Sequence, residues 1–126
     1  MVWSILLGVL IYIVIGMVYY SPLLFGLKWV NLLNIQDPKP NYGLLSLTAL
    51  LTTIVLYALL QFAAADSFAS GALIGVAAGI IVTLAYAKDF LFGLGTNTKQ
   101  SRMVFLIGAG YHVIALSIIG GVMTLF

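Results

Sequence analysis

The sequence predicts an all-α integral membrane protein whose four spans form one helical bundle over residues 1–126. Of its 126 residues, 63% are hydrophobic and 6% are charged, a composition that suits lipid surroundings rather than water. The apolar residues also gather into four stretches, each close to the roughly 20 residues that a helix needs to cross a bilayer. We expect these spans at residues 2–20, 43–65, 68–87 and 103–126.

The connection after the first span is predicted to contain a short helix over residues 22–33. Pro22 suits the first turn of a helix, because its φ is already helical and its missing N–H is not needed there. The segment is mostly apolar, so we expect it to lie in the membrane interface. Asp37-Pro38-Lys39-Pro40 then turns the chain back, since proline disfavours helical geometry in the residue before it.

The distribution of charge predicts the orientation of the spans. The five basic side chains fall in or beside the connections after the first and third spans, whereas the middle connection holds only Asp66. Because basic loops stay in the cytoplasm, we expect both of these connections inside and both termini outside. Residues 93–101 are polar and predict a loop. The basic residues are Lys28, Lys39, Lys88, Lys99 and Arg102.

The two halves of the chain resemble each other. A shift of 67 residues, from Leu24 to Leu91, sets Leu24-Phe25-Gly26-Leu27 against Leu91-Phe92-Gly93-Leu94 at the same end of equivalent spans. This match favours a duplicated helical hairpin. Because the shift covers two spans, the two hairpins are expected to be parallel repeats.

The third span carries a face of small side chains at every fourth position. Such a face lets another helix approach closely, and in lipid this contact drives helix association. We favour packing within the same bundle over contact with another subunit. The residues of this face are Gly71, Gly75, Gly79 and Thr83.

His112 is predicted to lie near the middle of the last span, about 15 Å into the bilayer at 1.5 Å per residue. An ionisable group at this depth is a functional hypothesis by default, and a polar site would combine it with Tyr111 and Thr52. We favour a neutral imidazole that is hydrogen-bonded across the bundle. The expected partners are Thr48, Thr52, Thr53, Tyr57, Gln61 and Ser117.

The sequence indicates no cofactor and no enzyme. With no cysteine, one histidine and three scattered aspartates, it offers no set of three or four converging metal ligands. We also find no nucleophile beside a base, no paired carboxylates and no phosphate-binding glycine loop. Five basic residues spread over two short connections do not predict nucleic-acid binding.

Two segments, residues 18–29 and 105–112, resemble the signatures of DUF1761, a widespread family of small four-span membrane proteins of unknown function. The resemblance implies the same fold and, from the spread of the family, a prokaryotic plasma membrane. The family usually has tryptophan at the position of Tyr19 and a Gly-Arg pair in the loop after the third span. The signature residues in this chain are Tyr20, Ser21, Pro22, Phe25 and Gly26.

Two functional hypotheses follow from these patterns. The first is a structural or accessory subunit, with no catalytic role, that packs against itself or against a larger membrane complex. The alternative is a homo-oligomeric carrier or channel for a small solute or ion. A pore requires a polar stripe that continues through the membrane, and we expect the first span to contribute none.

Overall fold

The computed structural model describes residues 1–37, 39–93 and 98–126, and in this part of the chain it contains helices and no strands. The all-α prediction is therefore confirmed. The helices are α1 (Val2–Tyr19), α2 (Gly26–Leu33), α3 (Tyr42–Phe62), α4 (Phe68–Tyr86), the π-helical η1 (Ala87–Gly93) and α5 (Lys99–Met123).

Four helices, α1, α3, α4 with η1, and α5, are each long and apolar enough to cross a membrane. Their bounds match the expected spans closely except around residues 93–101. There η1 extends α4 as far as Gly93, and α5 already begins at Lys99, so both ends of the expected loop are helical. A capping box explains the early start of α5: Ser101 N donates to Thr98 Oγ1 and Thr98 N donates to Ser101 Oγ. Residues 94–97 lie outside the described part.

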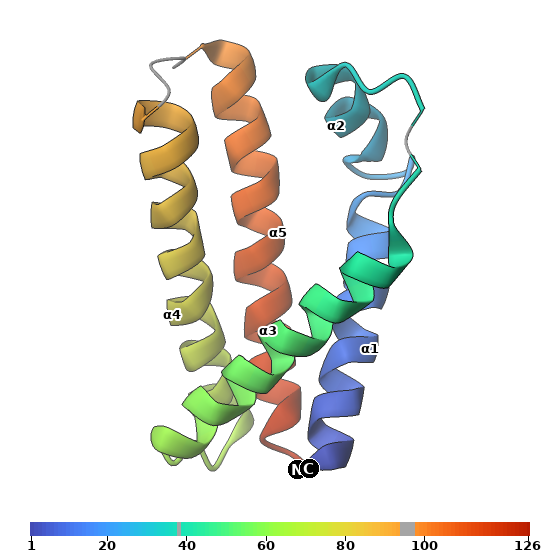
Figure 1. The fold of residues 1–126 in the computed structure, drawn as a ribbon. Helices are drawn as coiled ribbons and strands as arrows, with labels where there is room; N and C mark the ends of the chain where they lie inside the picture. Colours follow the sequence, from blue (N-terminus) through green and yellow to red (C-terminus); the bar gives the residue numbers. More distant parts are fainter. Residues whose placement is uncertain (38, 94–97) are drawn as a thin grey trace.

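The four long helices alternate in direction, and α3 crosses the others diagonally (Figure 1). α5 is the central helix, because it packs against α4 on one side and against α1 on another. Both termini lie at one end of the bundle, which we call the terminal end. The opposite end, which we call the basic end, carries α2, η1 and the start of α5, and with them the basic side chains.

The small-residue face of α4 lies directly against α5. A Cβ added to Gly75 would lie 2.0 Å from the carbonyl oxygen of Leu116, and one added to Gly71 would lie 2.2 Å from that of Gly120. The two backbones are therefore in contact, with no space for a side chain between them. Thr83 continues this face, and its hydroxyl donates to the carbonyl of Gly79 at 2.9 Å. The face packs within the chain and is not free for another subunit.

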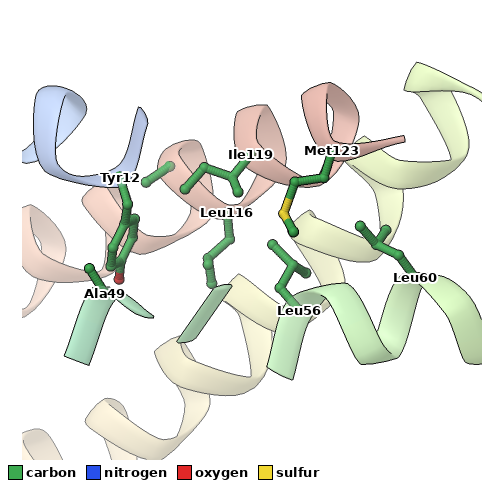
Figure 2. Close-up of a cluster of buried hydrophobic side chains, with 8 residues drawn as sticks. Tyr12, Ala49, Leu56, Leu60, Leu116, Ile119 and Met123 are labelled. Carbon is green, nitrogen blue, oxygen red and sulfur yellow. The ribbon is translucent and has the colours of Figure 1, made fainter. Parts of the chain in front are cut away.

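An apolar core fills the space between α1, α3 and α5 (Figure 2). α5 contributes its inward stripe, α3 approaches along one line of side chains, and Tyr12 of α1 points toward Ala49 of α3. The large buried side chains of α3 and α5 are Leu56, Leu60, Leu116, Ile119 and Met123.

The short helix at the basic end begins at Gly26, four residues after the expected start at Pro22. A turn occupies the preceding residues, in which Phe25 N donates to the carbonyl of Tyr19 and Gly26 N donates to that of Ser21. The turn needs glycine, because a Cβ at Gly26 would lie 2.1 Å from the carbonyl oxygen of Tyr20. The helix ends at Leu33, before the expected stop, whose Pro38 lies outside the described part.

The parallel-repeat hypothesis agrees with the helix directions but not with local structure. α1 and α4 run the same way, as do α3 and α5, which any up-and-down bundle shares. The matched tetrapeptides differ, however: Phe25 precedes α2 in a turn, whereas Phe92 lies within η1. Leu94, the last residue of the match, is outside the described part.

We predict that Gly75→Leu separates α4 from α5 and lowers the stability of the fold by more than about 3 kcal/mol, because the new side chain would overlap backbone atoms. The control is Leu73→Ile, at a side chain that is 69% exposed, and it should change stability by no more than about 0.5 kcal/mol. Thermal unfolding of the detergent-solubilised protein measures both. Equal stability of the two variants would contradict the close contact.

Candidate functional site

Aromatic and imidazole side chains gather in the half of the bundle nearer the basic end. They come from α1 and the turn after it, from the end of α4 and from the middle of α5. We call this group the His112 cluster. Its members are Tyr12, Tyr19, Tyr20, Tyr86, Tyr111 and His112.

His112 joins three helices through both nitrogens of its ring. Its Nδ1 lies 3.0 Å from the hydroxyl of Tyr12 on α1, and its Nε2 lies 3.3 Å from the hydroxyl of Tyr86 on α4. A neutral imidazole has one N–H donor and one acceptor nitrogen, so one phenol donates to the ring and the other accepts from it. The pair of bonds thus links α1 to α4 through α5.

Two more phenols tie α1 to α5 through backbone carbonyls. The hydroxyl of Tyr111 donates to the carbonyl of Tyr12 at 3.1 Å, and that of Tyr19 donates to the carbonyl of Ile107 at 2.7 Å. Glycines make room for both phenols: the Tyr111 oxygen lies 3.0 Å from the place of a Cβ on Gly16. These bonds let polar groups lie inside an apolar bundle, because each phenol has a partner.

The signature segment after α1 encloses this cluster from the basic end. Tyr20 packs against Trp29 of α2 with ring centroids 5.2 Å apart, and against Tyr111 at 5.3 Å. Phe25 lies 4.8 Å from the ring of Tyr19. The turn at Ser21 aims these rings toward α5, so the two segments that carry the family resemblance meet in space. Pro22 is exposed in the same turn.

The expected hydrogen-bond partners of His112 on α3 and α5 are wrong. Thr52 donates instead to the carbonyl of Thr48 at 2.8 Å within its own helix, so it does not join the cluster. The buried residues of α1 are Ser4, Gly8, Tyr12 and Tyr19, and its two tyrosines join the cluster. Gly8 separates Ser4 from Tyr12, so α1 carries no polar stripe that continues through the bundle.

The cluster contains no charged side chain. In the described part of the chain, Asp37 follows α2, Asp66 precedes α4 and Asp89 lies in η1, and three metal-ligating side chains do not come together. The chemistry available is hydrogen bonding by neutral groups. If the imidazole exchanges tautomers, its two phenol partners exchange donor and acceptor roles.

We predict that the bond between Tyr12 and His112 contributes about 0.6 kcal/mol, the usual size for a hydrogen bond between helices in a membrane. A double-mutant cycle with Tyr12→Phe and His112→Phe, followed by reversible unfolding, measures this coupling energy. Strictly additive effects would contradict a direct bond. The matched control pairs Tyr12→Phe with Thr83→Val. The Thr83 hydroxyl bonds to the carbonyl of Gly79 within its own helix, so this pair should give additive effects.

A comparison with models of protein families matches residues 3–124 to the family described as "Protein of unknown function (DUF1761)". The curated proteins and the solved structures give no match to this chain. The family match includes residues 18–29 and 105–112, so the resemblance of these two segments to the family is confirmed. Because it extends over nearly the whole chain, the protein belongs to the DUF1761 family, whose function is unknown.

Proposed function

We propose that this chain is a structural or accessory membrane subunit, without catalytic activity, that packs against a second copy of itself or against the helices of a larger complex. The observation that carries the proposal is the incomplete packing of α3. This helix packs mainly on α1 and only lightly on α4 and α5.

The uncovered surface of α3 is greatest near the basic end. Every residue from 42 to 48 is exposed, and farther along the helix the buried positions form one narrow line. Lipid is as apolar as leucine, so removing these side chains from lipid gives little free energy by itself. Helices associate in a membrane through closely packed van der Waals contacts, and a second helical surface would supply such contacts to α3. The buried residues of α3 are Ala49, Thr53, Leu56 and Leu60.

The polar groups support this proposal rather than catalysis. The phenols of Tyr19 and Tyr111 bond to backbone carbonyls and those of Tyr12 and Tyr86 bond to the imidazole, so the polar groups of the His112 cluster hold the helices together. The small face of α4 is occupied by α5, so a partner is expected at α3 and not at α4.

We predict that the gently solubilised native particle contains a second copy or another membrane protein next to α3. Since the chain has no cysteine, a single Leu47→Cys variant can be oxidised or treated with a thiol cross-linker in the membrane. We expect it to cross-link to the partner. The control Leu73→Cys, on the exposed side of α4, should remain uncross-linked. A monomeric particle without a Leu47→Cys product would contradict the proposal.

The alternative, a homo-oligomeric carrier, is favoured by a small polar pocket at the terminal end. The pocket has a volume of about 130 Å³ and includes the side chains of Ser4, Tyr57 and Gln61. The apolar core separates it from the His112 cluster, so these two polar regions do not form one stripe through the bundle. A pure symmetric oligomer that moves a solute into liposomes would nevertheless favour a carrier over a subunit.

We propose that the basic end is cytoplasmic and that both termini are outside, because the basic side chains lie at one end. Exposed sites for single cysteines are Gln36 at the basic end and Ala63 at the terminal end. An impermeant thiol reagent applied to intact cells should label Ala63→Cys and spare Gln36→Cys until the cells are lysed. The reverse pattern would mean the opposite orientation.

A further inference from the structure

An apolar groove of about 320 Å³ runs between α3 and α4, with α5 as its floor. The part between Leu51 and Leu59 is about 12 Å long at 1.5 Å per residue. One hydroxyl, that of Thr52, is in the groove wall, and it is already bonded to the carbonyl of Thr48. The apolar wall residues include Leu51, Val55 and Leu59 of α3, Ala78 and Val82 of α4, and Leu116 of α5.

The groove leads toward the His112 cluster. On α4, Tyr86 lies one helical turn beyond Val82, and on α5, His112 lies one turn before Leu116. Because α4 and α5 run in opposite directions, both steps lead toward the basic end. The two side chains meet there, with the Tyr86 hydroxyl 3.3 Å from the His112 Nε2. One helical turn beyond the groove lining, toward the basic end, there is therefore a pair of polar, uncharged groups.

The Tyr86 hydroxyl can form a further hydrogen bond. A phenol can donate one hydrogen bond and accept others, and within the described part of the chain the Tyr86 hydroxyl bonds only to His112, at a long distance. Tyr86 and His112 are both half-buried, and the α3 residues from 42 to 48 are all exposed. Both side chains are thus partly accessible next to the groove.

We propose that the groove binds a single-chain lipid with a small, uncharged head that bears a hydroxyl or a carbonyl. The chain would lie between α3 and α4, and the head would bond to the phenol of Tyr86 beside His112. The groove walls contain no charged side chain, so a charged head would lose its water without a countercharge. The groove adjoins the exposed residues 42–48 of α3, but the inference does not depend on the proposed subunit role.

The size of the groove favours a lipid chain over a helix from another protein. A helix with its side chains is about 10 Å across, so a 12 Å length of helix occupies roughly three times the volume of the groove. A groove of about 320 Å³ is at the lower end of the range for small-molecule sites, which is roughly 300–1,000 Å³. One alkyl or isoprenoid chain is the occupant of matching shape.

Photolabelling in lipid nanodiscs tests the inference with four decyl probes that carry a diazirine in the chain. Two probes have the proposed heads, a hydroxyl and a benzoquinone, and together they distinguish an alcohol from a quinone as the natural source. The other two have a carboxylate or no head. We expect the hydroxyl or quinone probe to label the facing walls of the groove at 51–59 and 78–82, and the carboxylate and headless probes to label them weakly.

Two tryptophan variants separate the groove from the general lipid-facing surface. Val82→Trp fills the groove and should reduce labelling by about tenfold or more through steric exclusion. Ile81→Trp adds the same bulk next to it, at a side chain that is 67% exposed, and should leave labelling unchanged. Equal labelling of these two variants would overturn the proposal, as would a cross-link from the groove to another protein.

Tyr86→Phe tests the role of the polar end. Loss of one neutral hydrogen bond of about 0.5–1.5 kcal/mol should weaken the hydroxyl or quinone probe about two- to tenfold. The headless probe should be unaffected, because it makes no such bond. A purely structural role of Tyr86 would weaken all probes alike, and that result would contradict head-group recognition even if the variant is less stable.

Discussion

The close contact between the backbones of α4 and α5 is the constraint on which the rest of this structure depends. Glycines on both helices leave no space for a side chain between them, as shown by Gly75 against the carbonyl of Leu116 and by Gly71 against that of Gly120. In a bilayer, where lipid is as apolar as leucine, such contact is a main source of helix association. It makes α5 the central helix, leaves its other faces for α1 and α3, and sets the register that brings Tyr86 to His112.

The second organising feature is the satisfaction of polar groups inside an apolar bundle. The phenols of Tyr19 and Tyr111 bond to backbone carbonyls across the contact between α1 and α5, and His112 bonds to a phenol on each side. An unpaired hydroxyl at this depth would be costly, so these bonds make one arrangement of the three helices much better than its alternatives. The signature turn at Ser21 then encloses the cluster, which gives a physical reason for a family signature split between two distant segments.

The position of α3 connects the fold to the proposed roles. This helix crosses the bundle diagonally (Figure 1) and packs mainly on α1. It therefore leaves an exposed surface outward and a groove toward α4. The outer surface is exposed over every residue from 42 to 48 and mostly apolar, which suits another helical protein. The groove is small, and near the basic end it leads to an imidazole and a phenol, which suits a lipid with a polar head. The two surfaces adjoin on α3, since Leu47 lies one helical turn before Leu51 of the groove wall.

The sequence by itself determined the membrane class, the four spans and the small-residue face, because each depends on residue type at a fixed helical period. It also singled out His112 and the signature Tyr20, Ser21, Pro22, Phe25 and Gly26. Only the tertiary structure decided which helix the small face meets and that Tyr12 and Tyr86 are the partners of His112. The reason is that apolar spans look alike on every side, so periodicity cannot say which faces meet. The early start of α5 was missed because Thr98 and Ser101 read as loop residues until their reciprocal cap is seen.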